Sequence, residues 1–363
     1  MNKKIFFSLI AGLCFSAGAL FLAFKRIPLG DISSYLQSID YFWIIPSAAL
    51  VYAAFLLRVI RWRTILAASH TLTFLQAYHP LMMGFMLNCV LPARVGELVR
   101  PVLLKRNHAI PFTTGIATVA AERLFDMVCL ISFLAVIFVT VPMDPDFSYT
   151  YKTYTLNRET LRTLGSSMLV FALILVLGIA AITLEWTQNL MMAILRKTPA
   201  CFSFLGATAP LAMERYFTRP MESLILNIAS GFSLVKNPAH LVFCILLSFG
   251  IYALHGLSFY LFSLGCPGVD LNFLTASAIM IIICFFIALP SVPGYWGVWE
   301  AGGVFSMALF GISGKEAAGY TLVNHAIQII PVIIFGMVSA VLTSVNIFKL
   351  SDAAPASELL VKE

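Results

Sequence analysis

The strongest constraint on the fold is a series of apolar runs along a chain of 363 residues. A helix needs about 20 apolar residues to cross a bilayer. Hydrophobic residues make up 60% of the chain and charged residues 11%, too apolar a balance for one water-soluble core. The sequence therefore predicts an all-α, multi-pass membrane protein. Its six transmembrane helices are expected near residues 5–24, 42–60, 113–141, 164–184, 239–264 and 317–346.

Two further runs, 74–91 and 273–289, each end in Leu-Pro and lead into a short charged segment that contains glycine. Each run either crosses the membrane or turns back as a re-entrant hairpin. Cytoplasmic loops are enriched in Lys and Arg. Hairpins place 14 of the 23 basic residues inside and 6 outside, whereas full spans place 10 inside and 12 outside. The charge asymmetry favours two re-entrant helical hairpins.

The hairpins make the two halves of the chain an inverted repeat. Each half then reads helix, helix, hairpin, helix, with opposite orientation in the membrane and both termini cytoplasmic. Apolar residues at helical spacing after Met221 predict a helix lying on the inner leaflet. The expected parts are a first repeat at 1–141 with a cytoplasm-opening hairpin at about 74–104, an external loop at 142–163, and a second repeat at 164–350. The second repeat includes a cytoplasmic interfacial segment at 185–238 and an outward-opening hairpin at about 273–312, and a polar cytoplasmic tail follows at 351–363.

The hairpin tips are expected near the middle of the membrane. Paired segments interrupted by Pro and Gly, in corresponding positions of two halves, point to the central site of a transporter. Irregular backbone at that depth is tolerated only where protein or a wet cavity surrounds it. The residues that mark these tips are Pro92, Gly96, Pro290, Pro293, Gly294 and Gly297.

Three charged residues at the first tip, Arg94, Glu97 and Arg100, recur every three positions. On a helix they would share one broad face, with Glu97 between two guanidinium groups. One interpretation is a structural ion pair that keeps buried charge tolerable. The other leaves an arginine free to bind a lipid phosphate in bidentate geometry. The sequence leaves both open.

Glu122 and Asp126 lie one helical turn apart on the third span, beside Arg123. They either pair with arginines of the first hairpin or form a protonatable pair that couples lipid movement to protons. In the second half, Glu300 follows the hairpin tip and His325 lies on the last span. The inverted repeat pairs this position with the Glu122 region. Arg94, Glu97, Arg100, Arg123, Glu300 and His325 are therefore the expected substrate-binding residues, and Glu122 and Asp126 the candidates for proton coupling.

Three motifs, PARVGELVRP, ERLFD and PGYWGVWEAG, resemble those of a known family. They are similar to the flippase-type membrane domain of lysylphosphatidylglycerol synthetases (the multiple peptide resistance factor) and its stand-alone bacterial relatives. The resemblance implies two re-entrant segments, a bacterial inner membrane and a lipid moved between leaflets, with polyprenyl or hopanoid lipids among the candidates. It falls on Pro92, Arg94, Gly96, Glu97 and Arg100, then Glu122, Arg123 and Asp126, and then Pro293, Gly294, Gly297 and Glu300.

The sequence departs from the family pattern at Ala93, where glycine is expected, and at Trp299, where a small or basic residue is common. The soluble aminoacyl-transferring domain of the fused enzymes is not expected here, so synthetase activity does not transfer. Two alternatives stay open. One is a non-transporting scaffold for an enzyme of lipid or envelope-glycan synthesis, and the other is an intramembrane transferase.

Catalytic and cofactor motifs are scarce. The sequence has no HExxH zinc helix and no Walker loop. The seven cysteines have no metal-ligand spacing, and the DPD at 144–146 lies in a loop too short for a sugar-donor site. The topology explains the positive charge, so nucleic acid is not an expected partner. The sequence predicts no cofactor and no metal, a membrane lipid as partner, and leaves the oligomeric state open.

Overall fold

The structure is a computed structural model that describes residues 16–21, 23–25, 27–67, 69–91, 94–140, 148–151, 154–183, 185–201, 213–219, 221–222, 238–289 and 292–345. Most of the first expected span, the interfacial helix expected after Met221, the tail, and the tip residues Pro92 and Pro290 lie outside these ranges.

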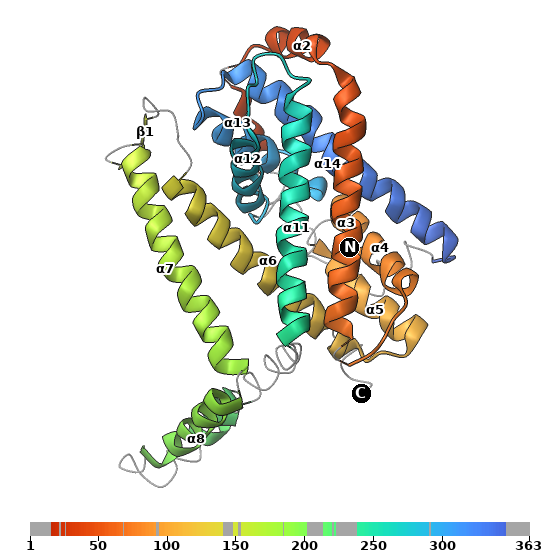
Figure 1. The fold of residues 1–363 in the computed structure, drawn as a ribbon, viewed down its shortest axis with the longest axis vertical. Coiled ribbons are helices and arrows are strands. Elements are labelled where there is room, and N and C mark those ends of the chain that lie inside the picture. The colour runs from red at the N-terminus through yellow and green to blue at the C-terminus, as the bar shows by residue number, and fades with distance from the viewer. Residues whose placement is uncertain are drawn as a thin grey trace.

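The described chain is helical apart from one small antiparallel hairpin (Figure 1). Three described helical stretches are long and apolar enough to cross a membrane: Tyr41–Leu66, Ala239–Ser263 and Gly314–Leu342. The prediction of a helical, multi-pass membrane protein is confirmed at this level. The elements are α2 (Leu29–Ser38), η1 (Tyr41–Trp43), α3 (Ile44–Leu66), α4 (Phe74–Val90), α5 (Gly96–His108), α6 (Phe112–Thr140), β1 (Ser148–Tyr151), β2 (Tyr154–Asn157), α7 (Arg158–Thr183), α8 (Glu185–Cys201), η4 (Glu214–Thr218), α11 (Pro238–Ser263), α12 (Phe273–Phe286), η6 (Pro293–Tyr295), α13 (Val298–Ala308) and α14 (Gly314–Leu342).

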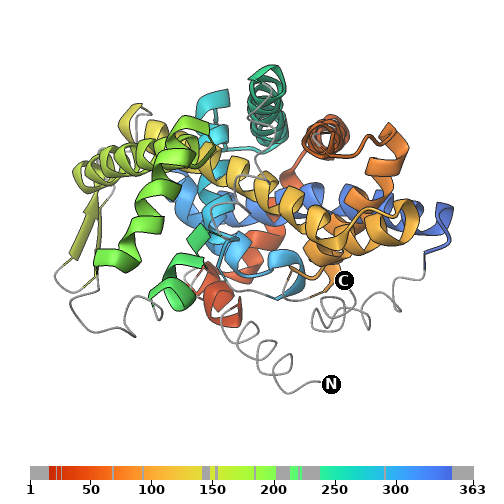
Figure 2. The ribbon, with the colours of Figure 1, turned by 90° about the horizontal axis from the view of Figure 1, so that it is seen from below.

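Helices α3 and α11 pack against each other along their length. Figure 2 looks along these two helices and shows them end-on, beside each other. Small and branched apolar residues face this contact, and Val51, Ala54 and Ile251 are fully buried. The core continues from this pair into α4, α12 and α14.

Two pairs of short helices, α4 with α5 and α12 with α13, lie toward opposite ends of α3 and α11 (Figure 1). A capping box between Thr73 and Gln76 starts α4, and the Asn272 side chain accepts from the Thr275 amide at 2.9 Å to start α12. Within the first pair the backbones of Gly84 and Gly96 touch, so that a Cβ on Gly96 would collide with the Gly84 carbonyl. A side chain there would force α4 and α5 apart.

The two halves pack in corresponding ways. Helix α5 packs on α6 as α13 packs on α14, and α4 packs on α14 as α12 packs on α6. Each helix pair, α4 with α5 or α12 with α13, is a helical hairpin. Each of these hairpins contacts both α6, the last helix of the first half, and α14, the last helix of the second half. This arrangement brings the ends of both hairpins to the middle of the molecule, where α4 contacts η6.

Two expected boundaries were wrong. Helix α3 continues to Leu66 instead of ending near residue 60, because Arg58 and Arg61, expected in a cytoplasmic loop, are paired with acids inside the protein. Helix α7 begins at Arg158 instead of near residue 164, and the expected loop at 142–163 contains β1 and β2, which pair from Ser148 to Asn157. The short helix α2 was not predicted from the sequence.

Candidate functional site

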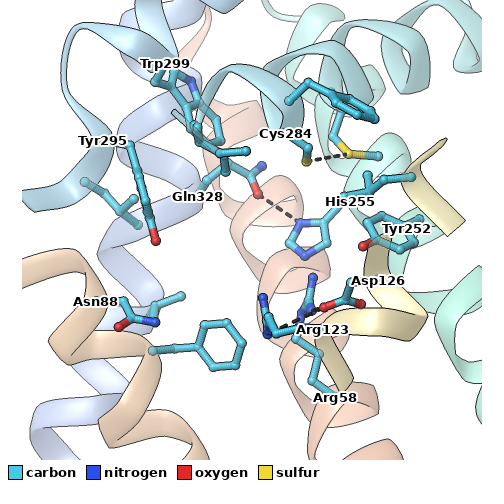
Figure 3. Close-up of a pocket in the computed structure, with 18 of the residues that line it drawn as sticks. Arg58, Asn88, Arg123, Asp126, Tyr252, His255, Cys284, Tyr295, Trp299 and Gln328 are labelled. Carbon is cyan, nitrogen blue, oxygen red and sulfur yellow. Dashed lines mark hydrogen bonds and ion pairs between the residues drawn. The ribbon is translucent and has the colours of Figure 1, made fainter. Parts of the chain in front are cut away.

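A cavity of about 550 Å³ lies where the two hairpins meet. Helices α3, α4, α6, α11, α12 and α14 line it, together with the start of α5 and the residues around η6 (Figure 3). Its volume falls in the range of small-molecule and cofactor sites. Its charged lining consists of three arginines and two acids: Arg58, Arg94, Arg123, Glu97 and Asp126. Positive charge therefore exceeds negative charge on its walls.

The acids of α6 anchor an ion-pair cluster behind this wall. Arg61 contacts Asp126 at 2.8 Å and Glu122 at 3.4 Å. Arg100 of α5 contacts Glu122 at 2.6 Å. The side chains of Arg61 and Glu122 have no exposed surface, and that of Arg100 is 2% exposed. Glu122 and Asp126 thus join α3, α5 and α6 through charges that would be costly to bury alone.

Two arginines face the cavity with looser protein contacts. Arg58 contacts Asp126 at 3.6 Å. Arg123 contacts Asp126 at 3.5 Å, Glu122 at 3.4 Å and Glu97 at 3.7 Å, and 34% of its side chain is exposed. These distances are long for charge-assisted hydrogen bonds. Both guanidinium groups therefore have donors available for an anion in the cavity.

Aromatic rings hold the arginine cluster on its other faces. The Arg100 guanidinium lies 4.2 Å from the centre of the Trp62 ring. The ring of Phe85 lies 5.6 to 5.7 Å from the guanidinium groups of Arg58, Arg100 and Arg123. Such contacts stabilise a cation through the quadrupole of the ring. Phe85 thus contacts three guanidinium groups, those of Arg58 and Arg123 on the cavity wall and that of Arg100 behind it.

Each hairpin tip presents a non-glycine residue in the left-handed backbone region. Arg94 has φ 54° and Tyr295 has φ 63°, and both line the cavity. Such residues are uncommon, and they concentrate at functional sites where the surrounding structure holds them. Arg94 also donates to the backbone carbonyl of Ile287 at 2.8 Å. The first tip is therefore tied to the end of α12.

The expected helical face of Arg94, Glu97 and Arg100 was wrong. Helix α5 begins at Gly96, so Arg94 precedes it, and the left-handed backbone at Arg94 turns its side chain toward the second hairpin. Arg100 is buried against Glu122 instead, and Glu97 contacts Arg123. The three side chains point to three different partners because helix α5 begins only after Arg94.

Glu300 and His325 form a buried pair that does not line the cavity. His325 Nδ1 lies 2.7 Å from Glu300 Oε1, and its Nε2 lies 2.7 Å from the Gly294 carbonyl oxygen. Glu300 Oε2 accepts from the Gly297 amide at 2.6 Å. Gly294 and Gly297 have φ 72° and 88°, which favours glycine at both positions. The pair thus fixes the second hairpin tip, which carries Pro293 at its start.

The cavity wall carries three exposed residues: Arg94 at the first tip, Met127 on α6 and Ala288 after α12. Met127 is 46% exposed. A residue that is exposed and also lines the cavity lies where the cavity reaches the surface of the protein. These three residues mark a mouth between α6 and the hairpin tips.

Arg58 and Arg61 were not predicted from the sequence as site residues. Their spacing of three puts both on one face of α3, opposite the acids at 122 and 126, and this spacing was the available signal. The neutral residues Asn88 and Tyr295 on the cavity wall were likewise not predicted from the sequence (Figure 3). Within the described ranges, no group of three or more His, Cys, Asp or Glu side chains could hold a metal.

Comparison with known proteins gives one family over most of the chain. A family model described as the lysylphosphatidylglycerol synthase TM region matches residues 9–336. A UPF0104 membrane protein of Methanocaldococcus jannaschii is 23% identical over 265 residues, which cover 72% of this chain and 96% of that protein. Glycosyltransferase AglD of Haloferax volcanii is 30% identical over 135 residues, which cover 36% of this chain and 21% of that protein.

Proposed function

Because the chain belongs to the lysylphosphatidylglycerol synthase transmembrane-region family, we propose that it is a flippase-like lipid translocase of the cytoplasmic membrane. In this proposal an anionic lipid headgroup crosses through the central cavity. The lipid tails stay in the bilayer beside the mouth at Met127. The observation that carries the proposal is the cationic wall at the meeting point of the hairpins, with Arg58 and Arg123 aimed into a cavity of about 550 Å³.

The lengths of the hairpin helices support re-entry. Helix α4 has 17 residues and α12 has 14, so at 1.5 Å per residue they are about 25 and 21 Å long. The hydrocarbon core is about 30 Å thick. Their partners α5 and α13 are shorter still, with 13 and 11 residues. We propose that both hairpins enter the membrane from opposite sides without crossing it, as two halves of an inverted repeat.

The excess of positive charge on the cavity wall favours an anionic lipid headgroup. A guanidinium group can bind two oxygens of one phosphate, which Lys cannot do in the same geometry. A lipid phosphate between Arg58 and Arg123 would offset the excess positive charge of the wall. Glu97 and Asp126 would keep these arginines oriented while the cavity is empty.

The test is lipid translocation in proteoliposomes made with the purified protein. Tail-labelled phosphatidylglycerol, which is anionic, is compared with tail-labelled phosphatidylcholine, which is zwitterionic. We expect the protein to speed the anionic lipid more, and Arg58→Ala with Arg123→Ala to remove this preference. Arg63→Ala is the matched control, because Arg63 is exposed and does not line the cavity. Rates equal to those of empty liposomes for both lipids would refute translocation.

A second candidate is an intramembrane transferase that acts on a lipid phosphate in the same cavity. It is favoured by the 30% identity to part of a protein named glycosyltransferase AglD. A non-transporting scaffold for an enzyme of lipid or glycan synthesis is the remaining alternative. A change in the mass of the lipid after incubation with a sugar donor would support the transferase.

A further inference from the structure

A chain of hydrogen bonds runs from the interior of α3 to a histidine on the cavity wall. Ser258 Oγ donates to the Ser47 carbonyl oxygen at 3.0 Å. Gln328 Nε2 donates to Ser258 Oγ at 3.1 Å. Gln328 Oε1 lies 3.0 Å from His255 Nδ1. The chain thus links α3, α11 and α14, and it ends at a ring that lines the cavity (Figure 3).

The donor and acceptor of each hydrogen bond follow from the Ser47 carbonyl group at the start of the chain. The Ser47 carbonyl oxygen can only accept, so it takes the single hydroxyl proton of Ser258. Ser258 Oγ must then accept from the amide nitrogen of Gln328, which leaves the amide oxygen facing His255. A flipped amide would set its oxygen against Ser258 Oγ, whose proton is already donated. His255 therefore donates through Nδ1.

This donation leaves the second ring nitrogen with a defined role. With Nδ1–H bonded to Gln328, the neutral ring of His255 presents the Nε2 lone pair as an acceptor. Nε2 has no hydrogen-bond partner among the described residues. The ring of Phe55 contacts His255 with centroids 6.2 Å apart and also lies 5.7 Å from the Arg58 guanidinium. The acceptor thus stands beside the cationic wall.

A lipid phosphate alone cannot satisfy this nitrogen. Phosphate oxygens are acceptors, and two acceptors do not hydrogen-bond to each other. An ammonium group would supply donors, but it would stand beside Arg58 as a like charge. A neutral hydroxyl group supplies a donor without added positive charge. The ligand that complements both Arg58 and His255 therefore carries a phosphate and, close to it, a hydroxyl.

We propose that His255 Nε2 accepts a hydrogen bond from a hydroxyl group on the alcohol esterified to the lipid phosphate. The substrate class is then a lipid phosphodiester with a hydroxylated headgroup, such as a glycerol or sugar phosphate. This inference rests on the proposed lipid translocation. A site built to hydrogen-bond a hydroxyl rejects the analogue that lacks it, because its buried partner is left unpaired.

The test compares two lipids of equal charge in proteoliposomes. Phosphatidylglycerol has two free hydroxyls on its headgroup, and phosphatidylmethanol has none. We expect the wild-type protein to move phosphatidylglycerol roughly tenfold faster, because phosphatidylmethanol leaves the Nε2 acceptor on the cavity wall without a donor. Equal rates for the two lipids, both well above empty liposomes, would overturn the hydroxyl inference and leave translocation standing. If neither rate exceeds that of empty liposomes, translocation itself fails.

Two substitutions separate the two nitrogens of His255. His255→Asn keeps a donor near the Nδ1 position for Gln328 and removes the acceptor at the Nε2 position. His255→Gln places its amide near the Nε2 position and gives up the bond to Gln328. We expect His255→Asn to lose the preference for phosphatidylglycerol and His255→Gln to retain part of it. The opposite order, in variants with wild-type melting temperatures, would overturn the role of Nε2.

Soluble glycerol phosphate separates a lipid site from a site for a free phosphate. It offers the same phosphate and hydroxyls without tails. We expect millimolar glycerol phosphate to leave phosphatidylglycerol translocation unchanged, because the tails contribute much of the binding. Strong inhibition would show that the site takes the free phosphate ester, and it would overturn the assignment to lipid.

Discussion

The guanidinium group of Arg94 donates a 2.8 Å hydrogen bond to the backbone carbonyl of Ile287, a residue 193 positions away in the chain. This bond joins the two helical hairpins. The bond crosses the meeting point of the two halves, beside the cavity that both hairpins line. A cation at this place has two roles. It contributes to the positive wall, and it ties the tip of the first hairpin to the end of α12.

Arg94→Ala removes both the cation and the tie. Hydrogen bonds to charged groups contribute about 1.5 to 3 kcal/mol, so we expect translocation of an anionic lipid to fall by roughly tenfold or more. Arg94→Lys should keep the charge and lose part of the bond to Ile287. Arg63→Ala, which removes an exposed cation of α3, is the control. An unchanged rate in Arg94→Ala would show that neither role matters.

Glu122→Gln tests whether the buried acids carry a proton or hold arginines. Glu122 faces Arg61, Arg100 and Arg123, so its loss leaves buried guanidinium groups without their partner. We expect unfolding to become easier by about 3 to 5 kcal/mol, measured by thermal unfolding in detergent. We also expect an imposed proton gradient to leave the wild-type translocation rate unchanged. A rate that follows the gradient and loses this dependence in Glu122→Gln would support the proton-coupling role.

His325→Gln tests the connection at the second hairpin tip. The two ring nitrogens contact two different groups, Nδ1 the Glu300 carboxyl group and Nε2 the Gly294 carbonyl oxygen. One amide cannot reach both groups in the same geometry. We expect faster amide hydrogen exchange at residues 292–299 and little change in α4. His79→Gln is the control, and equal exchange in both variants would argue against the connection.

Met127→Trp tests the mouth of the cavity. Met127 is 46% exposed and lines the cavity, so a larger ring there should obstruct the entry of lipid. We expect slower translocation with an unchanged melting temperature. Val136→Trp is the matched control, because Val136 is 47% exposed on the same helix but does not line the cavity. Equal slowing in the two variants would place the entry elsewhere.

Single cysteines at positions 105 and 315 test the topology. The hairpin arrangement places Lys105 on the cytoplasmic side and Lys315 outside. In a background without native cysteines, an impermeant thiol reagent added to intact cells should label position 315 and spare position 105. A cysteine at position 63 serves as the cytoplasmic control. External labelling at position 105 would contradict the re-entrant hairpins.

Local sequence was sufficient where the signal was apolar length and periodicity. The expected spans 113–141 and 239–264 correspond to α6 (Phe112–Thr140) and α11 (Pro238–Ser263). The runs ending in Leu-Pro correspond to α4 and α12, because proline after an apolar run disfavours continuation of the helix. One of the two interpretations of Glu122 and Asp126 was pairing with arginines of the first hairpin, and the structure gives Glu122 such a partner in Arg100.

Charge partners, in contrast, were decided by the tertiary structure. The sequence alone determined that this chain is a helical membrane protein with two interrupted apolar segments, since hydrophobic length and breaks are local properties. It could not show that Arg58 and Arg61 turn inward to Asp126, because an arginine near the end of an apolar run is equally consistent with a cytoplasmic loop. Nor could it show that Arg94 leaves the helix of Glu97, since one left-handed residue redirects the side chain. These contacts depend on how distant helices pack, and packing fixes which charges share a low-dielectric space.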